Sequence, residues 1–228
     1  MNGHHPSVPP TESSGSTLYG PQQSRFARFL ERREQRRPDP GARELRRRLL
    51  AGLEGRVLEV GSGDGRSFEY YPPGVTALLA VEPDATARES AAERARTATV
   101  SIEIADGIAE GLPTGDGSFD AVVVMGVLCS VADPRVVLEE LRRVLREGGE
   151  LRFWEHVRSR HVLFRTLQRV LDRLFWTKAL GGCETTRDTE SAIQVAGFSF
   201  ERLERGFHSS SLFTITTAPY IHGVARRV

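Results

Sequence analysis

The sequence predicts an α/β protein built on a mostly parallel β-sheet with helices on both faces. Three observations lead to this fold class. From Arg56 onward, short apolar runs that suit buried strands alternate with stretches of helical spacing. A glycine-rich turn at residues 61–65 directly follows the first of these runs. Acidic residues follow the next two runs, and open α/β sheets bind ligands at the carboxyl ends of their parallel strands.

Composition limits the classes of protein to which the chain can belong. It has 228 residues, 39% of them hydrophobic and 27% charged, with a net charge of +1, which fits one domain with additions. Neither a bilayer-spanning apolar stretch nor an apolar signal core is evident. The only cysteines, Cys129 and Cys183, form no disulfide framework or zinc motif by their spacing. We therefore expect a cytoplasmic protein with reduced thiols.

The N-terminal region differs in composition from the remainder. Residues 1–22 are rich in Pro, Ser, Gly and Thr, so we expect a disordered tail. Residues 23–53 are expected to hold two N-terminal helices, 23–37 and 41–53, separated by Pro38-Asp39-Pro40-Gly41. Residues 25–48 contain ten arginines and only four acidic residues. A solvated helix face explains such a charge run, and a surface for a partner is the alternative.

We expect the α/β domain to span residues 54–228. Five parallel strands are predicted at 56–60, 76–81, 100–105, 121–125 and 149–155. Helices are predicted between them at 84–97 and 134–146, with Gly148-Gly149 ending the second. Two closing strands at 198–203 and 220–226 bring the total to seven.

A helical insertion at about 159–196 separates strands five and six. The insertion contains a long amphipathic helix at 161–180 and a shorter helix at 186–196. We interpret it as a cap over a substrate pocket. Its mix of basic, aromatic and apolar residues also suits an interfacial helix, which allows loose membrane contact, and a dimer interface is the remaining alternative.

The turn after the first strand carries the strongest functional signal. It reads Glu59-Val60-Gly61-Ser62-Gly63-Asp64-Gly65, with glycines at every second position that let a ligand approach the backbone. The dinucleotide fingerprint would need glycine at position 66, where this chain has Arg66. The carboxylate of Glu59 would repel a pyrophosphate but suits a ligand with a cationic end.

The next strand ends supply further candidate ligand groups. Glu82, followed by Pro83, can accept hydrogen bonds from both hydroxyls of a ribose. Asp106, followed by Gly107, can accept from an adenine amino group. The fourth strand ends in an apolar turn that can pack on a purine face, formed by Met125, Gly126 and Val127.

This order of motifs resembles the class I S-adenosylmethionine-dependent methyltransferases with a methyltransferase type 11 domain. Phe119-Asp120 and Leu145-Arg146-Glu147-Gly148-Gly149 fit the same family. The resemblance implies a Rossmann-like fold and S-adenosyl-L-methionine as cofactor. It also implies that the turn at 59–65 holds the amino acid end of the cofactor, with Glu82 at the ribose and Asp106 at the adenine.

Further motifs narrow the resemblance to thiol and small-molecule methyltransferases. They are Val127-Leu128-Cys129-Ser130-Val131, Glu155-His156-Val157-Arg158, Gly182-Cys183 and Pro219-Tyr220-Ile221-His222-Gly223. The implied function is methyl transfer to sulfur, oxygen or nitrogen of a small, fairly apolar molecule. A lipid or quinone methyltransferase at a membrane surface and a non-catalytic S-adenosylmethionine-binding protein are the alternatives. Nucleic acid is not expected as partner, because the fourth strand lacks an Asp/Asn-Pro-Pro-aromatic turn; an oligomer remains open.

His156 is the candidate general base, because it closes the fifth strand near the expected position of the methyl group. A structural histidine is the alternative, and Glu155 can equally form hydrogen bonds in the pocket wall. We interpret Cys129 and Cys183 as buried packing residues rather than nucleophiles or metal ligands. The sequence thus predicts no metal site.

Overall fold

The computed structural model describes residues 39–173, 183–208 and 217–228. The predicted tail at 1–22 and the first predicted helix, 23–37, lie outside these residues. The strands are β1 (Gly55–Val60), β2 (Val75–Val81), β3 (Ile102–Ala105), β4 (Phe119–Met125), β5 (Leu145–His156), β6 (Phe198–Phe207) and β7 (Pro219–Arg227). The helical elements are α2 (Pro40–Leu50), the 3-10 helix η1 (Phe68–Tyr70), α3 (Ala85–Ala95), α4 (Pro134–Val144), α5 (Val162–Leu171) and α7 (Thr189–Val195).

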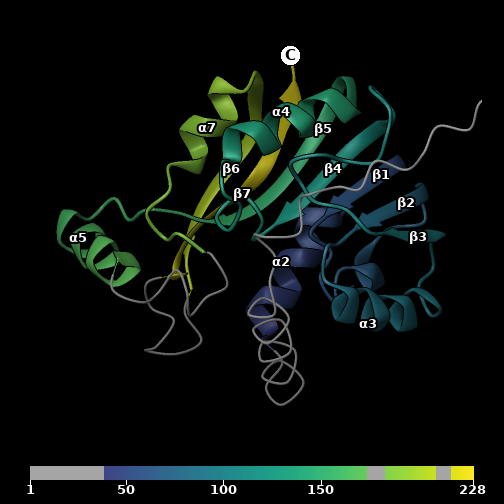
Figure 1. The fold of residues 1–228 in the computed structure, drawn as a ribbon, viewed down its shortest axis with the longest axis horizontal. Coiled ribbons are helices and arrows are strands. Elements are labelled where there is room, and N and C mark those ends of the chain that lie inside the picture. The colour runs from purple at the N-terminus through teal and green to yellow at the C-terminus, as the bar shows by residue number, and fades with distance from the viewer. Residues whose placement is uncertain (1–38, 174–182, 209–216) are drawn as a thin grey trace, which may run out of the picture.

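All seven strands form one sheet in the order β3-β2-β1-β4-β5-β7-β6 (Figure 1). Strands β1 to β5 pair in parallel, whereas β7 runs antiparallel to both of its neighbours, β5 and β6. The chain therefore leaves β1 toward β2 and later returns to the other side of β1 as β4. Such a reversal opens a crevice between the two strand ends, which is where open α/β sheets bind ligands.

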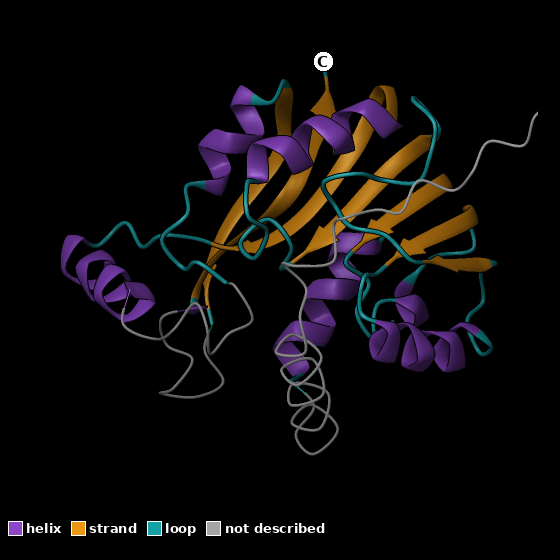
Figure 2. Ribbon diagram, viewed as in Figure 1, coloured by secondary structure: helices purple, strands orange, loops and turns teal. Residues whose placement is uncertain are grey.

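Helices cover both faces of the sheet (Figure 2). Strand residues alternate between the two faces, so adjacent Val57 and Leu58 enter different cores. The first core joins β1 and β2 to α2, η1 and α3, and the second joins β1, β4, β5 and β7 to α4 and α7. The prediction of a Rossmann-like, seven-stranded, mostly parallel sheet with helices on both faces is confirmed.

Aspartates fix where four of the described helices begin. Asp39, Asp84, Asp133 and Asp188 precede α2, α3, α4 and α7, and each carboxylate accepts a hydrogen bond from a backbone N–H of the first turn. Because Asp188 caps the last of these, α7 begins at Thr189, later than the start predicted at residue 186.

Two predicted boundaries, the end of α4 and the start of β5, are wrong. Helix α4 ends at Val144, and β5 begins at the next residue, whereas the sequence pattern predicted a helix to 146 and a strand from 149. Leu145 takes an extended conformation and pairs with Phe119 of β4. Gly148, with φ of 68°, therefore lies within the range of β5 and does not cap the helix.

Helix α5 lies apart from the layered sheet, at the left in Figure 1. It covers the first half of the helix predicted at 161–180, and residues 174–180 lie outside the described part. Buried Gln168 ties α5 to the rest: its Oε1 accepts from the N–H of Ser159 at 2.8 Å, and its Nε2 donates to the carbonyl of Thr185 at 3.1 Å. None of the described helices has both the length and the apolar character needed to cross a bilayer.

Candidate active site

The glycine turn after β1 leaves an open space beside its backbone. Gly61, Gly63 and Gly65 all have positive φ, a conformation that favours glycine. A Cβ on Gly63 would meet nothing within 4 Å, whereas one on Gly65 would lie 2.6 Å from the ring of Phe68. The hydroxyl of Ser62 is buried and has no hydrogen-bond partner among the described residues. This turn therefore offers a free polar group and room for a ligand.

Glu82, at the end of β2, is fixed beside this turn. Its Oε2 accepts from the N–H of Gly63 at 2.9 Å, and its Oε1 accepts from the N–H of Asp84 at 2.9 Å. Burial raises the pKa of Glu82, although these two hydrogen bonds act in the opposite direction. Each carboxylate oxygen can accept more than one hydrogen bond, so both oxygens keep capacity for the hydroxyls of a ligand.

Glu59 lies deeper than the turn it precedes. Its carboxylate is 2% exposed and accepts hydrogen bonds from Ser67 Oγ at 2.7 Å and Tyr71 OH at 3.0 Å. Burial raises its pKa to about 7, against the effect of these two hydrogen bonds. The sequence pattern did not predict the partners, because Ser67 and Tyr71 are eight and twelve residues downstream with no motif spacing to mark them.

Asp106, predicted to bind an adenine amino group, lies at the end of β3 with its side chain 73% exposed. It accepts from Arg88 Nη1 at 2.8 Å, and the same nitrogen donates to the backbone carbonyl of Glu82. Arg88 thus links the two acidic strand ends. Pro83 and Gly107 follow these strand ends and are half-buried.

The turn after β4 contacts the glycine turn. A Cβ built on Gly61 would lie 2.6 Å from Val127 Cγ2, so the carboxyl ends of β1 and β4 meet at these two residues. Gly126 has φ of 75°, and Met125, which closes β4, is half-buried. The apolar turn predicted to face a purine thus lies beside the glycine turn.

Buried Glu155 holds the β4 turn in place. Its two carboxylate oxygens accept from the N–H groups of Val127 and Cys129, each at 3.0 Å. Burial and the neighbouring Cys129 raise its pKa well above the ordinary value. Glu155 thus forms hydrogen bonds, as the sequence analysis suggested, and they are to the backbone of the turn after β4.

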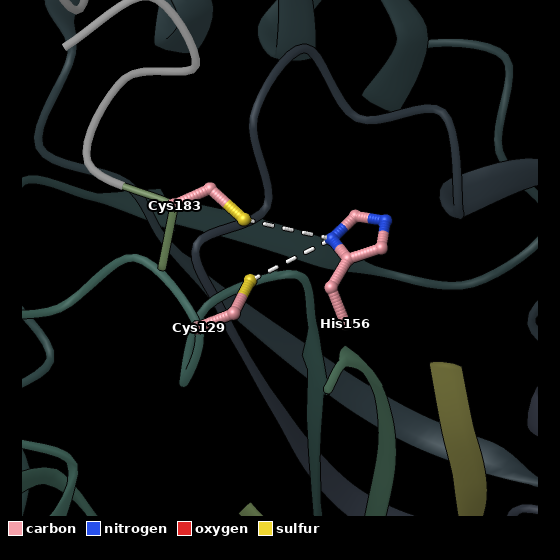
Figure 3. Close-up of side chains that lie close together, drawn as sticks. All are labelled: Cys129, His156 and Cys183. Carbon is pink, nitrogen blue, oxygen red and sulfur yellow. Dashed lines mark hydrogen bonds between the residues drawn. The ribbon is translucent and has the colours of Figure 1, made fainter. Parts of the chain in front are cut away.

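The candidate base His156 lies against both cysteines of the chain (Figure 3). Its Nδ1 is 3.7 Å from Cys129 Sγ and 3.8 Å from Cys183 Sγ. Both thiols are buried and free, whereas the imidazole is half-buried. Burial lowers the pKa of His156, but the interactions with Cys129 and Glu155 together outweigh burial and give a net increase. From the sequence, His156 was the candidate base and the two cysteines were interpreted as buried packing residues. The separation of the three residues along the chain gave no signal that they meet.

Together, these strand ends form one continuous edge with two kinds of chemistry. Backbone N–H groups, carboxylates and a free hydroxyl lie at the ends of β1 and β2, whereas thiols and an imidazole lie beyond β4 and β5. The first set suits a ligand with hydroxyl and ammonium groups. The second set suits a reacting group or a metal ion.

Comparison with known proteins identifies the family. A methyltransferase domain model matches residues 58–153. Human thiol S-methyltransferase TMT1B is 36% identical over 182 residues, covering 77% of this chain and 73% of the relative. Human thiol S-methyltransferase TMT1A is 35% identical, with the same coverage. The chain belongs to the class I S-adenosylmethionine-dependent methyltransferases.

A solved structure shares the fold of this methyltransferase. The N-methyltransferase NodS from Bradyrhizobium japonicum superposes with a TM-score of 0.62 at 19% identity, covering 83% of this chain and 98% of that one. The family assignment confirms that the chain is an enzyme, as the sequence motifs implied. The roles of the individual residues in this methyltransferase remain predictions.

Proposed function

We propose that this methyltransferase binds S-adenosyl-L-methionine at the carboxyl ends of β1, β2 and β4 and methylates the sulfur of a small, fairly apolar thiol. The observation that carries the cofactor site is the turn itself, where Gly63 faces open space beside the fixed carboxylate of Glu82. The orphaned hydroxyl of Ser62 adds a buried polar group in need of a partner.

In this proposal, each residue at the strand ends contacts a different part of the cofactor. Glu82 accepts from the ribose hydroxyls with oxygens already oriented by two backbone N–H groups. The turn at 61–65, with Ser62 and Gly65, surrounds the amino acid end, and Glu59 provides a negative charge beneath it. Met125, Gly126 and Val127 pack against the purine.

The adenine contact is the least enclosed part of the proposed site. Asp106 is mostly exposed and paired with Arg88, so it can accept from an amino group only at the rim of the crevice. Pro83 and Gly107 flank it. A Cβ on Gly107 would lie 2.9 Å from Val81 Cγ1, so this position also needs a residue without a side chain.

The choice of sulfur as acceptor atom follows from the relatives and agrees with the second half of the edge. Two human relatives that cover about three-quarters of this chain are thiol S-methyltransferases. When bound, the cofactor supplies an electrophilic methyl group on a sulfonium. The protein holds the acceptor sulfur in line with it, and such positioning accounts for much of the rate in a displacement of this kind.

The direct test measures S-adenosylhomocysteine release from the full chain with a panel of a small thiol, a phenol and an amine of matched apolar size. We expect release with the thiol. Release only with the phenol or the amine would contradict the acceptor assignment, and absence of S-adenosylmethionine binding by calorimetry would contradict the cofactor site.

A second candidate function is methylation of a lipid or quinone at a membrane surface. It is favoured by one observation: α5 exposes large apolar side chains, with Leu163 88% and Val162 64% exposed. Binding of the chain to vesicles of anionic phospholipid, lost in Leu163→Glu and kept in the exposed-acid control Glu147→Ala, would support this candidate. Equal sedimentation of the protein with and without vesicles would contradict it.

A further inference from the structure

Three potential metal ligands from separate parts of the chain converge at the end of β5. Cys129 belongs to the turn after β4, His156 closes β5, and Cys183 precedes α7. Their donor atoms, two thiol sulfurs and the imidazole Nδ1, all lie within 4.8 Å of one another. Figure 3 shows both sulfurs pointing toward the same ring nitrogen.

The two sulfur–nitrogen distances match a tetrahedral zinc site. Zinc binds thiolate sulfur at about 2.3 Å and imidazole nitrogen at about 2.1 Å, and tetrahedral angles then place sulfur and nitrogen about 3.6 Å apart. The two observed distances from His156 Nδ1 are 3.7 Å to Cys129 Sγ and 3.8 Å to Cys183 Sγ. An ion could therefore occupy the centre of the group with only small movements of the side chains.

The backbone holds these ligands without help from an ion. The N–H of Cys129 donates to Glu155, and its carbonyl accepts from the N–H of Glu184 at 2.8 Å. That second bond places the segment containing Cys183 beside the β4 turn. His156 is placed by β5, which pairs with β4 on one side and with β7 on the other. Such support of the ligands is typical of preformed metal sites.

We propose that Cys129, Cys183 and His156 Nδ1 bind a zinc ion with one coordination position left for the sulfur of the acceptor. Two thiolates and one imidazole favour zinc over the hard cations Mg²⁺ and Ca²⁺. Within the described residues, no further Cys, His, Asp or Glu joins the group. Three protein ligands with an open fourth position are the arrangement of catalytic rather than structural zinc.

The position of the group suits a role in the transfer reaction. Cys129 lies two residues beyond Val127, which contacts the glycine turn at Gly61. The zinc site therefore borders the proposed cofactor crevice. This part of the inference rests on the proposed thiol methylation, whereas zinc binding by the three residues does not.

The chemistry is a single displacement. The acceptor thiol binds the zinc as a thiolate and its proton passes to solvent. The thiolate sulfur then forms a bond to the methyl carbon, while the bond from that carbon to the sulfonium sulfur breaks and its electron pair stays on the leaving sulfur. The neutral thioether binds zinc weakly and leaves. Lowering the pKa of a bound nucleophile in this way is an established effect of zinc.

This assignment gives His156 a different role from the predicted general base. Its Nδ1 becomes a metal ligand, and the zinc takes over the activation of the acceptor. It also departs from the sequence-based expectation that the chain has no metal site, because Cys129 and Cys183 are 54 positions apart and match no zinc spacing.

The first experiment tests the metal alone. Full-length protein is purified under reducing conditions, stripped with a chelator, and titrated with Zn²⁺ against a chromophoric competitor. Its thiols are counted with and without the metal. We expect one zinc ion per chain and protection of both thiols. Cobalt in place of zinc should give the intense visible absorption of a tetrahedral thiolate site. A reduced wild-type protein that binds no zinc would overturn the proposal.

Variants locate the site. Cys129→Ser, Cys183→Ser and His156→Asn should each lose most of the zinc affinity, whereas His208→Asn, which changes an exposed histidine elsewhere, should retain it. Circular dichroism checks that each variant is folded. If a ligand variant fails to fold, the cobalt spectrum and thiol count of the wild type still decide the question. Full zinc binding in the folded double variant Cys129→Ser/Cys183→Ser would overturn the assignment.

The open position is tested without the cofactor. A small aromatic thiol added to the cobalt-loaded protein should shift its visible spectrum, and the matching phenol should not. An unchanged spectrum would overturn the open position. Thiol methylation at full rate by zinc-free protein would overturn the catalytic role while leaving the proposed function intact. Zinc and thiol binding without any methyl transfer would contradict the proposed function while leaving the metal site intact.

Discussion

The two ends of the ligand-binding edge are built in different ways. At β1 and β2, the functional groups come from two short segments, residues 59–65 and 82–84, and the backbone itself supplies hydrogen bonds to Glu82. At β4 and β5, three side chains from positions 129, 156 and 183 meet, and each is placed by a different element. The first end suits a ligand with many polar groups, the second a single reacting centre.

This difference teaches where each end is sensitive. At the β1–β2 end the backbone shapes the site. We therefore expect ligand affinity there to change only with the few side chains that contact the ligand or the turn. The β4–β5 end depends on the placement of segments, and one buried carboxylate, Glu155, accepts hydrogen bonds from the backbone of the turn. Five predictions test these two cases.

The largest effect is expected at Glu155. Glu155→Ala would leave the buried N–H group of Cys129 and the partly buried N–H group of Val127 without acceptors, at roughly 1–3 kcal/mol each. We expect a loss of about 4 kcal/mol in the free energy of unfolding, measured with urea. Glu147→Ala, an exposed position in the same strand range, is the control and should stay within about 0.5 kcal/mol of the wild type. Similar curves for the two variants would refute this role of Glu155.

Next in size is the loss of cofactor affinity on removing the carboxylate of Glu82. Two charge-assisted hydrogen bonds to a ribose account for about 3 kcal/mol, so Glu82→Ala should weaken S-adenosylmethionine binding roughly 100-fold in calorimetry. Glu89→Ala changes an exposed carboxylate on α3 and should bind as the wild type does. Unchanged affinity in Glu82→Ala would mean that the cofactor lies elsewhere.

A pH dependence is expected from Glu59, whose pKa is raised to about 7 by burial. A positively charged ligand end prefers the ionised carboxylate, so S-adenosylmethionine should bind roughly tenfold more tightly at about pH 8 than at about pH 6. Binding should also release a proton, detectable as a calorimetric heat that varies with the buffer. Glu59→Gln should remove both effects, and a pH-dependent wild type with an equally pH-dependent variant would exclude Glu59 as the source.

The same residue should affect the ligand-free protein in the opposite direction. Because its folded-state pKa lies above the ordinary value of 4.5, protonated Glu59 contributes stability that is fully present below about pH 4.5 and is lost as the pH rises through about 7. The loss amounts to about 3 kcal/mol at most. Between about pH 5 and pH 8, Glu59→Gln should therefore have a flatter dependence of unfolding free energy on pH than the wild type.

The smallest effect is expected at Ser62, and it has two parts. Its buried hydroxyl has no partner among the described residues, so Ser62→Ala should leave the stability of the ligand-free protein unchanged or slightly increased. S-Adenosylmethionine affinity should fall by up to about tenfold, the equivalent of one hydrogen bond. A fall in stability without a fall in affinity would show that the hydroxyl has a structural partner.

The sequence alone predicted most of the sheet and the family, because these depend on local patterns. Apolar runs placed all seven strands to within a few residues, and the turn from Glu59 to Gly65 indicated the cofactor class. The start of β5 at Leu145 was missed, because the pairing with Phe119 that extends the strand is a tertiary contact. The grouping of Cys129 with Cys183 was missed for the same reason.

The antiparallel β7 sets an order on the folding of this protein. Strand β6 hydrogen-bonds only with β7 in the described sheet, and β7 lies between it and β5. During synthesis, β5 therefore has one unpaired edge and β6 has no partner strand until residues 219–227 have left the ribosome. His156, which pairs with Tyr220 of β7, gains its final surroundings in that last step. Nascent chains that stall before this point would expose β6 as an unpaired strand to which chaperones can bind. The pairing of β1 to β4 does not depend on β7 and can already be formed.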